Sequence, residues 1–69
     1  MYRRNVESSN IRSIGYEDEV LEVEFLNGSI YGYYNVPENL FEGIMNADSH
    51  GRYLNEYIKK ANYRYKKIN

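Results

Sequence analysis

The 69-residue sequence has no cysteine and no tryptophan, a single proline and a single histidine. Without thiols the chain forms neither disulfides nor a cysteine-ligated zinc site, which are the usual supports of domains this small. A chain of this size buries only about 60% of its unfolded surface, so its hydrophobic core is thin. The sequence therefore predicts one small domain that depends on side-chain packing, and it argues against an enzyme with an enclosed pocket.

Long apolar segments are also missing from the sequence. The longest uninterrupted apolar stretches have two residues, whereas a membrane-spanning helix needs about 20. Residues 1–9 carry basic side chains without the apolar segment that a signal peptide requires. We therefore expect a soluble, cytoplasmic protein that has no membrane partner.

Charge is distributed unevenly along the chain, although the formal net charge is only -1. Residues 13–48 contain many acidic side chains and neither lysine nor arginine, whereas residues 49–69 are rich in both basic types. A local patch can hold a positive potential that the total charge conceals. The C-terminal part of the chain is therefore the place to look for an anionic ligand.

Alternation of apolar and acidic residues predicts the clearest strand of the protein. Leu21, Val23 and Phe25 alternate with glutamates, which is typical of a half-buried strand. Asn27-Gly28 follows and favours a hairpin turn. The predicted antiparallel meander consists of residues 9–16, 19–26 and 29–36.

The hairpin turn allows two registers that place Tyr31 and Tyr33 on opposite faces of the sheet. A two-residue turn at Asn27-Gly28 puts both tyrosines opposite glutamates, on the solvent face. A three-residue turn that starts at Leu26 puts them opposite apolar residues, in the core. We favour the second register because a core without tryptophan needs the area of aromatic rings, but a slip of one residue decides the matter.

Two consecutive helices follow the meander. Pro37 suits the first turn of a helix, where its missing N–H has no partner in any case. Ser49 can cap a second helix, and the same spacing of apolar residues recurs in both segments. We predict helices over residues 37–47 and 49–60, both packed on one face of the sheet. The predicted core consists of Leu21, Val23, Phe25, Leu40, Phe41, Ile44, Leu54 and Ile58.

These elements define an α+β fold, a three-stranded antiparallel meander covered on one face by two helices. Residues 63–68 alternate well enough for a short extended segment, which could pair with the first strand at the edge of the sheet. Residues 1–8 show no sustained period, and we expect them to form a flexible lead-in. The single domain then spans residues 9–69.

An ordered set of short motifs resembles the KTSC domain family over about residues 8–68. The matching motifs are Ser9-x-Ile11-x-x-Ile14-Gly15-Tyr16, Leu21-x-Val23-x-Phe25-x-x-Gly28, Tyr31-x-Tyr33-x-x-Val36-Pro37, Ala47-x-Ser49-x-Gly51-x-Tyr53-x-Asn55-x-x-Ile58 and Tyr63-x-Tyr65. That family is named for a C-terminal appendage of some lysyl-tRNA synthetases and also occurs as small stand-alone bacterial and phage proteins. The resemblance implies a domain identity, and RNA binding is the function usually suggested for the family.

The residues themselves point to the same ligand class at the C-terminal end. Basic groups neutralise phosphates, and tyrosine rings stack on unpaired bases. The candidate nucleic-acid-binding residues are Arg52, Lys59, Lys60, Tyr63, Arg64, Tyr65, Lys66 and Lys67. We expect single-stranded RNA or tRNA as the partner, and we assign Tyr31, Tyr33, Tyr53 and Tyr57 mainly to packing. The alternative is a protein-interaction or oligomerisation domain without a nucleic-acid role, in which acidic and basic regions drive self-association or bind a protein partner.

Catalysis has little support in the sequence. Ser49 and His50 are adjacent in a predicted helical turn and do not face each other, so we expect a helix cap and a surface histidine. Glu22 and Glu24 share a solvated strand face. One histidine among scattered acids is not a metal site, and no glycine-rich phosphate loop is present. We therefore expect no enzymatic activity, no cofactor, no metal and no small-molecule substrate.

Overall fold

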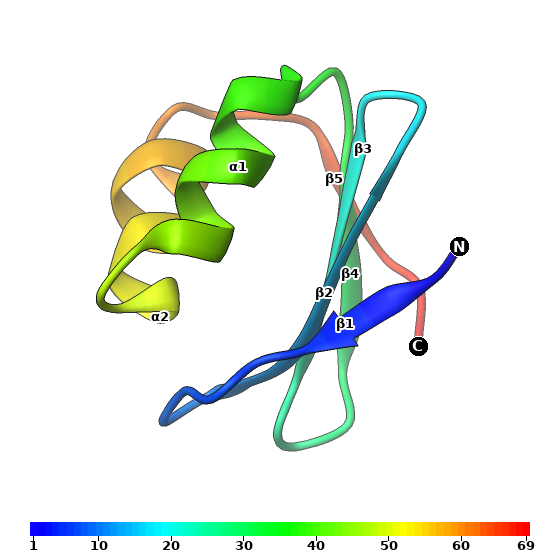
Figure 1. Cartoon of the computed structure of the whole chain (residues 1–69). Helices are drawn as coiled ribbons and strands as arrows, with labels where there is room; N and C mark the ends of the chain where they lie inside the picture. Colours follow the sequence, from blue (N-terminus) through cyan, green and yellow to red (C-terminus); the bar gives the residue numbers. More distant parts are fainter.

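The computed structural model describes all 69 residues and contains a five-stranded antiparallel sheet with helices on one face only (Figure 1). The strands lie in the order β1 (Arg3–Asn5), β2 (Ile11–Glu17), β3 (Val20–Phe25), β4 (Ile30–Tyr33) and β5 (Tyr65–Lys67). The helical segments are α1 (Glu38–Asn46), α2 (His50–Tyr53) and the π-helix η1 (Leu54–Lys59). The predicted α+β class and the helices on one face are confirmed. Both termini lie on the side of the sheet away from the helices (Figure 1).

The number of strands is larger than the sequence predicts, because both ends of the chain add a strand. Residues 1–8 are not an unstructured lead-in throughout, since Arg3–Asn5 forms β1 and pairs with β2. The C-terminal strand pairs with β4 and not with the first strand, so that Tyr65 lies opposite Tyr33. Both edges of β2 are occupied by β1 and β3, which leaves β4 as the free edge for β5.

Side-chain contacts across a glycine hold β1 in place. The Arg3 guanidinium forms an ion pair with Glu22, and its Nε donates to the Ser13 hydroxyl at 3.1 Å. A Cβ atom on Gly15 would lie 2.6 Å from the Tyr2 carbonyl oxygen and 2.9 Å from Arg3 Cγ. Strand β1 therefore depends on polar contacts and on the absence of a side chain at Gly15. Neither feature produces a hydrophobic period that can be detected in the sequence.

The β3–β4 hairpin adopts the three-residue turn. Tyr31 pairs with Val23 and Tyr33 pairs with Leu21, which places both tyrosines on the helix-facing side of the sheet. Gly28 has a φ of +94°, a left-handed conformation that glycine adopts without steric cost. Tyr33 is 4% exposed and belongs to the core. The favoured register is therefore confirmed.

Both helices begin where the sequence predicts. Helix α1 starts directly after Pro37, and the Ser49 hydroxyl caps α2 by accepting a hydrogen bond from the Arg52 backbone N–H at 3.2 Å. The predicted helix over residues 49–60 is instead a short α-helix that continues as a π-helix, with the Lys60 N–H donating to the Asn55 carbonyl at 3.1 Å. None of the helices has the length and hydrophobicity that a membrane crossing requires.

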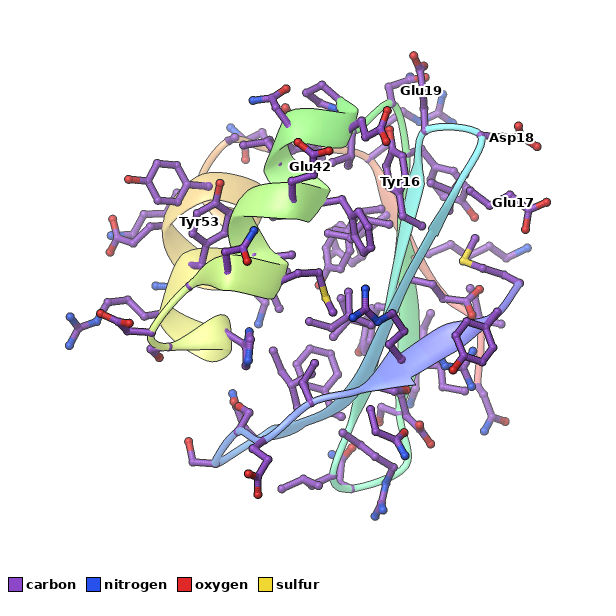
Figure 2. All side chains as sticks on the ribbon, in the orientation of Figure 1. Tyr16, Glu17, Asp18, Glu19, Glu42 and Tyr53 are labelled. Atoms are coloured by element: carbon purple, nitrogen blue, oxygen red, sulfur yellow. The ribbon has the colours of Figure 1, made fainter.

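Tyr16 connects the sheet to α1 and to the segment before it (Figure 2). Its hydroxyl donates to the Val36 carbonyl at 2.6 Å, and its ring stacks on Phe41 with centroids 5.2 Å apart. Burial, followed by the charges of Glu19 and Glu38, raises the pKa of Tyr16. The segment before α1 is therefore held against β2 by a neutral phenol.

The core contains most of the predicted residues and several more. The buried apolar residues are Ile11, Ile14, Leu21, Val23, Tyr33, Val36, Ile44, Leu54 and Ile58. Phe25, Leu40 and Phe41 were predicted in the core, but they are only half-buried and pack against its border. The prediction missed Ile11 and Ile14 because a register shift between Ile11 and Ser13 interrupts the alternation of β2.

The buried isoleucine of η1 provides a test of this core. Ile58 is 0% exposed, so Ile58→Ala is expected to lower the free energy of unfolding by about 2–5 kcal/mol in urea titrations. Ile68 is 48% exposed, and the matched change Ile68→Ala should cost less than about 1 kcal/mol. Equal losses at the two positions would show that η1 does not pack on the sheet as described.

Candidate functional site

An open groove of about 860 Å³ lies beside β4. The residues that line it come from the end of β3, the β3–β4 turn, β4, the end of η1 and the segment that leads into β5. They are Phe25, Asn27, Ser29, Tyr31, Tyr33, Lys59, Asn62, Tyr63, Arg64 and Tyr65. The groove therefore combines segments that are far apart in the sequence, and strand pairing brings them together.

Aromatic rings form the floor of the groove. Tyr31 meets the edge of Phe25 with centroids 5.9 Å apart and lies 6.1 Å from Tyr65. Tyr65 also lies 5.9 Å from Tyr33, its partner in the sheet. Tyr65 is 65% exposed, so a planar ligand can reach its ring. Offset and tilted rings of this kind offer π-faces on which a further ring can stack.

Two cations border the aromatic floor without a carboxylate partner. Lys59 Nζ lies 5.5 Å from the centroid of the Phe25 ring, a cation–π distance. Arg64 is exposed, and the ion pairs of the protein are formed by Arg3 and Lys60 instead. No aspartate or glutamate lines the groove. The positive charge of Lys59 and Arg64 is therefore available to an anionic ligand.

The buried phenol at the base of the groove stays neutral at physiological pH. Burial, and to a lesser extent the neighbouring Tyr31 and Tyr65, raises the pKa of Tyr33 from 10.0 to about 12. A tyrosine is charged only above its pKa, so the Tyr33 phenol adds no negative charge that would oppose Lys59 and Arg64.

The structure brings half of the candidate binding residues into this groove. Lys59, Tyr63, Arg64 and Tyr65 line it. The remaining four candidates are outside its lining. Arg52 belongs to α2, Lys60 pairs with Glu56 at 3.3 Å, Lys66 lies opposite Gly32 and Lys67 lies opposite Tyr31.

Sequence reasoning missed the contribution of the β3–β4 hairpin. Phe25 was predicted as core, and Tyr31 and Tyr33 were assigned mainly to packing, yet all three line the groove. The three-residue turn was the one sequence feature that pointed to this contribution, because it places both tyrosines on the helix-facing side of the sheet. It becomes informative only once β5 is known to pair with β4 and to add Tyr65 beside them.

The single histidine links two helices. His50 Nδ1 lies 2.7 Å from the Ile44 carbonyl oxygen, which joins the last turn of α1 to the start of α2. The side chain is half-buried and not at the surface as expected. No group of three or more His, Asp or Glu side chains is arranged to hold a metal ion.

The fold and the groove define a small α+β domain with an open aromatic and cationic surface. The chain belongs to the KTSC domain family, whose model matches residues 7–66. A KTSC domain protein from Yersinia pestis has a similar crystal structure, with a TM-score of 0.88, 39% identity and coverage of 99% of this chain and 97% of that one.

Sequence relatives include both a stand-alone protein and part of a much longer one. An uncharacterised protein from Stutzerimonas stutzeri is 43% identical over 99% of both chains. A lysine–tRNA ligase from Nostoc punctiforme is 40% identical over 77% of this chain, which corresponds to 10% of the ligase. The same domain therefore occurs alone and as a small region of a tRNA ligase.

The raised pKa of Tyr33 gives a prediction for alkaline solution. Because the pKa of Tyr33 rises from 10.0 in the unfolded chain to about 12 in the folded protein, its contribution to stability is complete below pH 10.0 and is lost as pH rises toward about 12. Between these pH values the free energy of unfolding, measured in urea, should fall less with rising pH in Tyr33→Phe than in the wild type. The same pH dependence in both proteins would contradict a raised pKa at Tyr33.

Proposed function

We propose that the chain is a non-catalytic RNA-binding module that holds unpaired nucleotides of a single-stranded RNA or tRNA in the groove beside β4. One observation carries this proposal, the combination of the exposed Tyr65 ring with the unpaired cations Lys59 and Arg64 in a groove without carboxylates. Stacking on aromatic rings contributes about 1–3 kcal/mol per base, and the cations neutralise phosphates.

The groove suits unpaired nucleotides better than a duplex. In an RNA helix the bases are stacked on one another and their faces are inaccessible to side chains. Tyr31 and Tyr65 offer ring faces, which contribute binding energy only when a base is free to stack on them. With few cations in the groove, we expect affinity in the micromolar range or weaker at physiological salt.

The relatives support RNA as the ligand class. The name lysine–tRNA ligase refers to an RNA, and this domain forms part of that protein. A shared ligand would explain why one domain occurs both in a ligase and alone. With RNA as the ligand, we expect the protein to be cytoplasmic.

Self-association is the second candidate, and the separation of charge in the fold favours it. Glu17, Asp18 and Glu19 gather at the β2–β3 turn, with Glu42 on the nearby helix α1 (Figure 2). This acidic turn of one copy could contact Lys59 and Arg64 of another in a head-to-tail arrangement. Light scattering with and without a short RNA separates the two candidates, because a self-associating domain without a nucleic-acid role should form oligomers whose mass RNA leaves unchanged, whereas an RNA-binding monomer gains the mass of its ligand.

Charge removal in the groove tests the phosphate contacts. Arg64→Gln is expected to weaken the binding of short single-stranded RNAs several-fold and to reduce the magnitude of the slope of log K against log salt by about 0.7. The matched variant Arg52→Gln removes the same charge outside the groove and should leave the slope within error of the wild type. Fluorescence anisotropy at several salt concentrations measures both quantities, and equal effects of the two variants would refute a groove-specific contact.

Removal of the exposed ring tests the stacking contact. Tyr65→Ala should weaken binding by about 1–3 kcal/mol, with little change in the salt slope, because it removes a π-face and no charge. Tyr57 is also exposed but lies outside the groove, so Tyr57→Ala should bind RNA like the wild type. Amide chemical shifts should move in β4 and in residues 59–65. Shifts confined to other surfaces would place the RNA elsewhere.

A further inference from the structure

Some side chains of the groove can act only as hydrogen-bond donors, or are held so that one end of the group is already used. Lys59 and Arg64 can only donate. Asn27 Oδ1 accepts a hydrogen bond from the Ser29 backbone N–H at 3.0 Å. A backbone N–H cannot accept, so this bond fixes which end of the amide faces the turn. The Asn27 amino group is the end of the amide that has no hydrogen-bond partner within the protein.

The other polar groups of the groove do not oppose this polarity. Ser29, Asn62 and the tyrosine hydroxyls can each donate or accept, so they adjust to any base edge. An aspartate or glutamate would be an obligate acceptor, and none lines the groove. Among the side chains of fixed polarity, the groove therefore contains donors only.

We propose that this polarity makes the groove select keto bases, uracil and guanine, over the amino bases cytosine and adenine, with Asn27 as the specificity-determining residue. The inference rests on the proposed function. Uracil O4 and guanine O6 accept hydrogen bonds, whereas cytosine N4 and adenine N6 carry donors. At this position an amino base presents its own donors to the Asn27 amino group, so the hydrogen bond that a keto oxygen would accept is missing.

The position of Asn27 makes it suited to reading a stacked base. It follows Phe25 by two residues and precedes Tyr31 by four, within the hairpin that supplies most of the aromatic floor. A base stacked at the turn end of the floor, beside Phe25 and Tyr31, extends its edge in the plane of its ring toward the wall of the groove to which the turn contributes Asn27 and Ser29. Stacking alone tolerates every base, so the selection has to come from such an edge contact.

The first measurement compares ligands that differ at the keto or amino position but have rings of similar size. Tetranucleotides of uridine are compared with those of cytidine, and tetranucleotides of inosine with those of adenosine, by fluorescence anisotropy with the wild-type protein. The keto member of each pair should bind about three- to tenfold more tightly, which is the effect of one net hydrogen bond.

The second measurement replaces the hydrogen-bond donor at Asn27 by an acceptor. In Asn27→Asp the carboxylate can still accept from the Ser29 N–H, and Asp-Gly is as suitable for a hairpin turn as Asn-Gly. The variant presents acceptors, so cytidine and adenosine should now bind more tightly than uridine and inosine, while all affinities fall with the added negative charge. Asn39→Asp adds the same charge on α1, at an exposed position outside the groove, and should keep the keto preference.

The outcomes separate this inference from the proposed function. Binding of all four RNAs with equal affinities within each pair would overturn the keto selection and leave RNA binding intact. Absence of binding by any RNA would overturn both. Retention of the keto preference in a folded Asn27→Asp protein would exclude Asn27 as the discriminating residue. The wild-type series requires no variant, so it decides the selection even if the substitution disturbs the turn.

Discussion

The register of β3 against β4 is the constraint on which the rest of the structure depends. With Leu21 opposite Tyr33 and Val23 opposite Tyr31, both tyrosines face the helices, and β5 then aligns Tyr65 with them. A shift by one residue would turn both rings to the other face, which would take Tyr33 out of the core and both tyrosines out of the groove. The left-handed Gly28 that closes the turn therefore determines where the aromatic surface lies.

The parts of the fold that sequence reasoning predicted are those with a strong local signal. The alternation of β3, the hairpin turn, the proline before α1 and the Ser49 cap each act within a few residues. The strands β1 and β5 have three residues each, too few for a period, and are held by distant contacts such as the pair of Arg3 and Glu22. Lys59 and Arg64 of the groove could be picked out because charge is visible in a sequence, whereas the contribution of the hairpin to the groove depends on which strand β5 joins.

Tyrosine serves two purposes in this small domain. Its ring supplies the area that a core without tryptophan lacks, as at Tyr33, and the same residue type at Tyr65 stays largely exposed. Because a single face of the sheet carries both, the aromatic floor of the groove is continuous with the hydrophobic core. The rigidity of packed core residues is thereby transmitted to the groove without a separate scaffold.

The position of the chain ends has a consequence for modular use of the domain. The groove opens on the side where the helices pack, and both termini leave from the opposite side of the sheet (Figure 1). A second domain fused to either end would extend away from the groove and leave its entrance clear. The fold thus behaves as an attachable unit, which agrees with its occurrence both as a whole protein and as a tenth of a tRNA ligase.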